Sequence, residues 1–207
     1  MDWEVRHALN YETLLTAAGG SEAKAGEAFD QAKELLDINE PFDRSYGEYA
    51  RLLDLDIAAV RQAYEENVRA FGTLEGKVWI INRDSPLWPK QVSMFAYIPR
   101  FLYVQGDVNL LKQPIVSVIG TRSPSLEGRK LAYQSSLALA KGNFVVASGL
   151  ALGIDAIAHK SVLSEGEKTI AVIGTPLNQT YPAEHKELQQ IIGEQGAVVS
   201  RFGPATR

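Results

Sequence analysis

Residues 115–128 read IVSVIGTRSPSLEG, and this stretch decides the fold. Its apolar run over residues 115–119, with branched side chains at almost every position, predicts a strand buried on both faces. Gly120 breaks the run, and a helical pattern starts at Gly128. This order aims backbone N–H groups and a helix N-terminus at one point, which favours an anion, most often phosphate. Arg122 adds a charge whose fork matches phosphate oxygens, so the stretch predicts a site for a phosphate-bearing ligand.

The alternation of strand and helix patterns continues along the chain. Further strands are predicted over residues 144–147, 169–173 and 197–200, and helices over residues 128–141, 154–165 and 183–194. Glycines close the helical patterns, as expected at helix C-termini. Apolar strands alternating with amphipathic helices predict a parallel sheet with right-handed crossovers. The predicted fold class is therefore α/β, with a doubly wound parallel sheet.

The first third of the chain has a different composition. Residues 1–74 are rich in alanine, leucine and acidic side chains, and apolar residues recur at helical spacing between Tyr49 and Phe71. This pattern predicts a small all-helical domain. Strand-like segments at 78–81 and 101–104 lead into the alternating region, so residues 75–207 form the second predicted domain.

The loops that follow the carboxyl ends of parallel strands open on one edge of the sheet, where ligands bind. In this chain they are residues 120–125, 148–153, 174–178 and 200–203. All four contain glycine and small hydroxyl side chains, and two contain an arginine. The loops at the opposite edge lack this enrichment in small hydroxyl residues, which indicates that one edge alone binds a ligand.

Several of these residues also have structural explanations. The glycines of the second loop either permit positive φ and close packing or let a ligand approach. Arg122 has an internal ion pair as its alternative. We expect Asp155 to interact with a helix dipole and His159 to be a satisfied buried histidine rather than a base. Tyr181 is expected to pack at a loop, with stacking on a nucleic-acid base as the alternative.

The composition excludes several classes of function. The 207 residues carry a formal net charge of −4, which argues against a broadly basic nucleic-acid-binding protein but leaves room for a local basic patch. There is no cysteine, and the three histidines are too scattered for a metal site. No apolar run is long enough to span a membrane and no secretory signal is present, so a cytoplasmic location is expected. Neither dinucleotide nor P-loop fingerprints occur, and no catalytic residues can be recognised.

Spaced blocks of this sequence resemble the DNA-processing protein DprA (Smf) family. They are IGTR at 119–122 with Gly128, SGLALGIDAIAH at 148–159, and TIAVIG at 169–174 followed by Tyr181-Pro182. The segment LYVQGD at 102–107 also fits, and the resemblance covers roughly residues 77–203. The combination of blocks is specific to the family, whereas no single block would be.

The resemblance implies an extended Rossmann fold that binds single-stranded DNA without sequence preference. It implies a role in natural transformation, protecting incoming strands and helping to load the RecA recombinase, as a homodimer without catalytic turnover or cofactor. The DNA-contacting positions of the family map onto Gly120, Thr121, Arg122, Ser148, Gly149, Leu150, Gly153 and Gly174.

The chain departs from the family pattern in three ways. Leu152 stands where some relatives have lysine, which removes one phosphate-binding charge from the second loop. Asn178 and His185 occupy positions that often hold aspartate and asparagine. Relatives also continue beyond the position of Arg207 with a helix, further strands and the dimer surface, so we expect this chain to be a fragment or a shortened member that lacks the family's dimer surface.

Two rival functions come from other classes. One is an enzyme of the lysine-decarboxylase-like Rossmann group that cleaves nucleoside monophosphates, although the Gly-Gly-x-Gly-Thr-x-x-Glu signature of that group is absent from this sequence. The other is a small-nucleotide sensor. Release of base from AMP would indicate the enzyme, and a mononucleotide that binds far better than an oligonucleotide would indicate the sensor.

Overall fold

The computed structural model describes residues 3–95 and 98–206, which divide into two compact units. One unit comprises the chain up to Leu74 together with residues from Gly203 onward, and the other spans Glu75–Phe202. The sequence assigned the last residues to the sheet domain, whereas in the structure they group with the helices. Gly203 is buried directly against the carboxylate of Glu12, with no space for a Cβ atom.

The helical unit contains α1 (Trp3–Ala17), α2 (Glu22–Leu35), the short 3-10 helix η1 (Phe42–Ser45), α3 (Tyr46–Leu53) and α4 (Ile57–Phe71). Its core includes Phe42, whose ring stacks on Tyr49 and Tyr64 with centroids 4.0 and 5.1 Å away. Such pairs of buried aromatic rings add specific geometry to the area they bury. Asp54, with φ of 54°, ends α3 in the left-handed region and turns the chain into α4.

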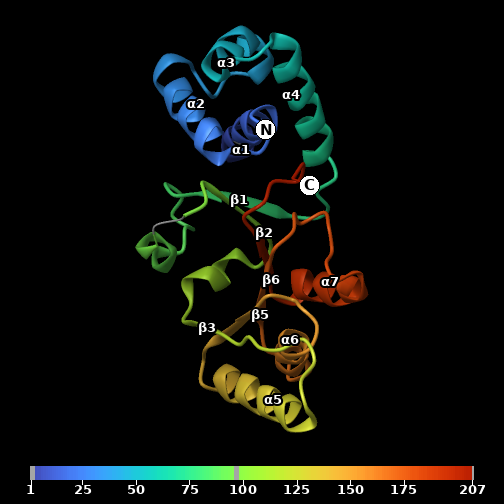
Figure 1. Cartoon of the computed structure of the whole chain (residues 1–207). Helices are drawn as coiled ribbons and strands as arrows, with labels where there is room; N and C mark the ends of the chain where they lie inside the picture. The colour runs from blue at the N-terminus through green and yellow to red at the C-terminus, as the bar shows by residue number, and fades with distance from the viewer. Residues whose placement is uncertain (1–2, 96–97, 207) are drawn as a thin grey trace. The chain divides into compact units, whose positions relative to one another are not determined.

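The second unit is built on one six-stranded sheet. Its strands are β1 (Val78–Asn82), β2 (Phe101–Gly106), β3 (Ile115–Ser117), β4 (Val145–Ser148), β5 (Thr169–Ile173) and β6 (Ala197–Ser200). Their order across the sheet is β1-β2-β6-β5-β4-β3 (Figure 1). The four strands from β3 to β6 are parallel, whereas β2 runs antiparallel to both β1 and β6. The predicted α/β class, with parallel strands that follow a helical domain in the sequence, is confirmed, and the two antiparallel pairings of β2 make the sheet mixed.

The parallel strands are neighbours in chain order, and this order sets how the sheet is covered. They are connected by α5 (Leu126–Lys141), α6 (Ile154–Ser164), and the short 3-10 helix η4 (Ala183–His185) with α7 (Lys186–Gln195). Right-handed crossovers between consecutive neighbours place these helices on a single face, so the described strands have one layer of connecting helices rather than the two layers of a doubly wound sheet. The other face packs against Trp88 and against the 3-10 helix η3 (Val108–Lys112); a further 3-10 helix, η2 (Lys90–Met94), precedes β2.

Strand β3 differs from its prediction. The sequence predicts a strand over residues 115–119 that is buried on both faces, but β3 ends at Ser117, which is exposed, and Ile119 is 75% exposed. Among the described residues β3 pairs only with β4, so it lies at an edge of the sheet. An apolar run indicates that a strand is able to be buried, but its place in the sheet order decides whether it is.

Candidate nucleic-acid interface

The first loop, residues 120–125, lies between β3 and α5, and all of its residues except Pro124 are exposed. Thr121 and Arg122 are both exposed. No ion pair of the Arg122 guanidinium occurs among the residues that the structure describes, so the alternative of an internal ion pair is not what this structure shows. The Thr121 hydroxyl accepts the Ser123 N–H at 3.2 Å, and Ser125 caps α5 by accepting the Gly128 N–H at 3.1 Å. The loop therefore offers a cation and a hydroxyl group to the solvent.

The second loop, residues 148–153, begins at the last residue of β4, and several of its polar groups make hydrogen bonds within the protein. The Ser148 hydroxyl is buried and donates to the Val118 carbonyl at 2.6 Å. The N–H groups of Gly149 and Ala151 both donate to Asp155 Oδ2, at 3.1 and 3.3 Å. These two amides are therefore bound within the protein and are not available to coordinate a phosphate in this conformation. The polar groups of this loop instead stabilise the fold around it through these internal hydrogen bonds.

Leu150 lies at the centre of the second loop with its side chain fully buried. Its φ of 59° is in the left-handed region, which a bulky residue adopts only when its surroundings hold it there. The carbonyl of Leu150 accepts a 2.7 Å hydrogen bond from His185 Nδ1. Of the predicted site residues, Ser148 and Leu150 thus direct their side chains inward, and Gly149 is the exposed one of the three.

The first and second loops are in direct contact. The carbonyl of Thr121 accepts the Ile154 N–H at 3.2 Å, and a Cβ atom on Gly120 would lie 2.7 Å from Ile154 Cγ1. Gly153, with φ of 79°, has no space for a Cβ atom because the backbones of Thr121 and Arg122 lie against it. Of the two explanations given for the second-loop glycines, close packing accounts for Gly153. This packing holds the backbone of Arg122 in place.

The third loop, residues 174–178, is less closely packed at its first residue. Gly174 is exposed and has nothing within 4 Å of the position of a Cβ atom. Tyr181, which precedes Pro182 through a cis peptide bond, is 64% exposed. The Ser200 hydroxyl donates to the Thr175 carbonyl at 2.7 Å and so connects the end of β6 to this loop. An exposed ring at this position keeps the alternative of base stacking available.

His159 and His185 are both buried. His159 Nδ1 lies 2.8 Å from Thr169 Oγ1, whose hydroxyl group donates to the Val146 carbonyl at 2.7 Å. Burial, together with the nearby His185, lowers the pKa of His159 to about 4, so this ring is neutral at physiological pH. The predicted burial of His159 is confirmed, although its Nε2 has no hydrogen-bond partner among the described residues.

Asp155 was expected only to interact with the helix dipole, and its hydrogen bonds to the second loop were not predicted.

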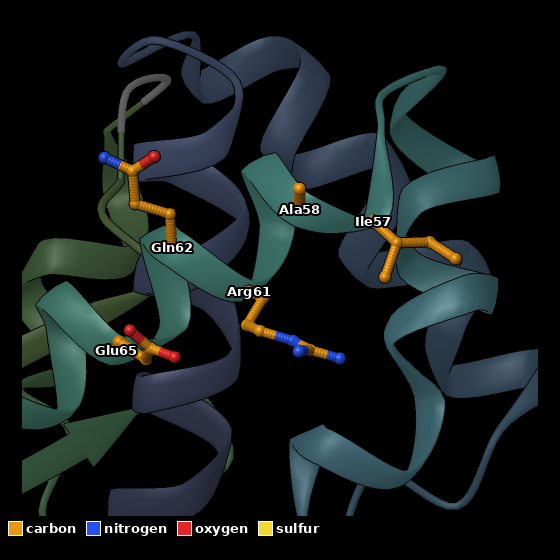
Figure 2. A pocket seen from close by; sticks show the side chains of 5 residues that line it. All are labelled: Ile57, Ala58, Arg61, Gln62 and Glu65. Atoms are coloured by element: carbon orange, nitrogen blue, oxygen red, sulfur yellow. The ribbon is translucent and has the colours of Figure 1, made fainter.

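Three further observations concern metal ligands, membrane spans and cavities. Among the described residues, no group of three or more histidine or acidic side chains could hold a metal ion. No helix of the described chain is long and apolar enough to cross a membrane. A pocket of about 350 Å³ lies on α4 of the helical unit, lined by Ile57, Ala58, Arg61, Gln62 and Glu65 (Figure 2). None of the predicted DNA-binding residues is among those that line this pocket.

Comparison with known proteins gives consistent matches. A family model described as DNA recombination-mediator protein A matches residues 79–207. The DNA processing protein DprA of Streptococcus pneumoniae is 42% identical over 117 residues, which are 56% of this chain and 41% of that protein. Protein Smf of Escherichia coli is 36% identical over 124 residues, 59% of this chain and 33% of that protein. The matched regions therefore span less than half the length of these curated relatives.

Two solved structures are also similar. The X-ray structure of DNA processing protein A from Streptococcus pneumoniae has a TM-score of 0.70 and 30% sequence identity, and the match covers 96% of this chain and 69% of that one. A structure of DNA processing protein A from Helicobacter pylori, which concerns its single-stranded DNA binding mode, has a TM-score of 0.53 and 31% identity. It covers 61% of this chain and 56% of that one.

Proposed function

Since this chain belongs to the DNA recombination-mediator protein A family, we propose that its first loop binds the phosphate backbone of single-stranded DNA without regard to sequence. The observation that carries the proposal is Arg122, an exposed guanidinium without an ion pair among the described residues, at the carboxyl edge of a parallel sheet. The similar protein from Helicobacter pylori is described as binding single-stranded DNA, which supports the same ligand class here.

The physical basis is a contact to phosphates rather than to bases. The Arg122 fork donates to phosphate oxygens, and Thr121 adds a hydroxyl group beside it. Such contacts read no base edges, so binding tolerates any sequence and weakens with salt. Gly149 and Gly174, both exposed, let a strand pass close to the backbone of the second and third loops. Tyr181 is the ring that would stack on a base, which is worth about 1–3 kcal/mol.

The wider role is also a proposal. A recombination mediator acts on single strands before a recombinase does, and we propose that this chain contributes to natural transformation by binding incoming strands and helping RecA to load. A cytoplasmic location is part of this proposal, because the strands and the recombinase meet there. The chain covers only part of its relatives, so dimerisation and the RecA contact are proposed for the family protein as a whole. We propose no catalytic turnover, since both buried histidines serve the fold.

The test is the variant Arg122→Ala, with binding measured by fluorescence anisotropy to unrelated single-stranded oligonucleotides at two salt concentrations. Loss of one charge-assisted hydrogen bond should weaken binding about tenfold for every sequence. It should also reduce the slope of log K against log salt by about 0.7, the value of one phosphate on a single strand.

Lys141→Ala is the matched control, because it removes one exposed cation at the other end of α5. Unchanged binding by Arg122→Ala, with the fold intact, would contradict the proposal. A duplex that binds as tightly as a single strand would contradict the preference for single strands. Base released from AMP would indicate the rival enzyme, and a mononucleotide that binds far better than an oligonucleotide would indicate the rival nucleotide sensor.

A further inference from the structure

We propose that Asp155 and His185 are positioning residues that hold the second loop in its left-handed conformation and thereby fix the first loop, which carries Arg122. This inference rests on the proposed function, because it concerns how the DNA-binding loop is kept in place. It starts from the three consecutive residues at the centre of the second loop, Gly149, Leu150 and Ala151. Side chains from outside the loop bind a backbone group of each.

Asp155 holds two of these groups. Its buried Oδ2 accepts the N–H groups on both sides of Leu150, from Gly149 and Ala151. Gly149 is needed for this approach, since a Cβ atom there would lie 2.9 Å from the same carboxylate oxygen. One oxygen that bridges residues two apart in the sequence fixes the backbone between them, in the manner of a nest that binds an anion. Here the anion is supplied by the protein itself.

His185, which belongs to η4, binds the third backbone group, the Leu150 carbonyl. It lies at the end of η4, is almost fully buried, and makes a 2.7 Å hydrogen bond to the Leu150 carbonyl. Because a carbonyl oxygen only accepts, Nδ1 carries the proton. The amides on both sides of Leu150 therefore bind Asp155 of α6, and the Leu150 carbonyl binds His185 of η4. These three hydrogen bonds hold the leucine at its φ of 59°.

The constraint passes from the second loop to the first through backbone contacts. Gly153 lies against the backbones of Thr121 and Arg122, and the Ile154 N–H donates to the Thr121 carbonyl at 3.2 Å. Asp155 is the next residue on α6. Since the Arg122 side chain makes no ion pair within the described chain, its direction depends on this backbone. Releasing the second loop should therefore loosen the first.

The experiment compares His185→Ala with His185→Asn in the full chain. Asparagine Nδ2 is bonded to Cγ as histidine Nδ1 is, so it restores the donor to the Leu150 carbonyl without the ring. We measure single-stranded DNA binding by anisotropy and amide hydrogen exchange by NMR at Gly149, Ala151 and residues 121–123. His185→Ala should bind about fivefold more weakly and lose amide protection in both loops, whereas His185→Asn should recover at least half of each effect.

A second pair of variants tests the carboxylate. Asp155→Ala should also weaken binding about fivefold and deprotect Gly149 and Ala151. Its matched control is Asp107→Ala, because Asp107 likewise accepts a backbone N–H, from Asn109 at 3.1 Å. Asp107 also pairs with Lys168, which precedes the first residue of β5 and so lies at the opposite end of the parallel strands from the two loops. This control should lose stability locally but keep both binding and the protection of the two loops.

The outcomes separate the two proposals. If His185→Ala and Asp155→Ala leave loop protection unchanged, or if His185→Asn fails to recover either effect, the positioning role is overturned while the Arg122 test stands on its own. If Arg122→Ala binds like the unchanged protein, the proposed function fails, but hydrogen exchange still decides whether the two residues position the loops.

Discussion

The first and second loops both follow the carboxyl ends of parallel strands and both contain glycine and serine, yet they differ in how far their side chains are exposed. The first loop exposes Thr121 and Arg122 to solvent. The second loop gives its Ser148 hydroxyl, two amides and one carbonyl to internal partners. The comparison shows that the polar groups of loops at one end of the strands divide into those exposed to solvent and those that hydrogen-bond within the protein.

The largest expected effect tests the contact between the loops. Gly153→Ala should lower the free energy of unfolding by about 2–4 kcal/mol, because the residue has positive φ and a Cβ atom would collide with the Thr121 and Arg122 backbones. Urea denaturation measures the change. Gly174→Ala is the control, since the same methyl group enters open space, and it should change stability by less than about 0.5 kcal/mol. Equal effects of the two variants would remove the distinction between a packed glycine and an open one.

The next effect concerns the buried imidazole ring of His159 on α6. The pKa of His159 is about 4 in the folded protein and near 6.5 when unfolded, so the unfolded state binds more protons between these values. Its contribution to stability is fully present above pH 6.5 and is lost as pH falls toward 4, by up to about 3 kcal/mol. Denaturation at pH 7, 5.5 and 4 should show a steeper loss for the unchanged protein than for His159→Gln. Parallel pH profiles of the two proteins would contradict this account.

The smallest effect compares one hydroxyl group from each loop. Ser148→Ala removes the bond to the Val118 carbonyl and should cost about 1 kcal/mol of stability with little change in single-stranded DNA affinity. Thr121→Val should do the reverse, with stability changed by less than about 0.5 kcal/mol and affinity reduced about two- to fivefold. Thermal melts and anisotropy on both variants give the comparison. If Ser148→Ala weakens binding more than Thr121→Val, the assignment of inward and outward roles is wrong.

Much of the fold could be predicted because its signals are local. The run 115–119 and the later alternation of strands and helices gave the α/β class and the edge at which the loops gather. The sequence also singled out Arg122 and the burial of His159. It did not give the antiparallel pairing of β1 and β2 at the far side of the sheet, or the edge position of β3, because pairing partners are chosen between distant segments. The grouping of the residues from Gly203 onward with the helices depends likewise on a contact with Glu12.

The sequence by itself determined which residues reach the carboxyl edge of the sheet, since strand and helix periodicity place each loop. Only the tertiary structure decided which of their polar groups remain free for a ligand. The hydrogen bond from Ser148 to Val118 spans 30 residues and the one from His185 to Leu150 spans 35. Whether a donor faces solvent or an internal acceptor depends on segments that far apart meeting within hydrogen-bonding distance, and no local pattern carries that information.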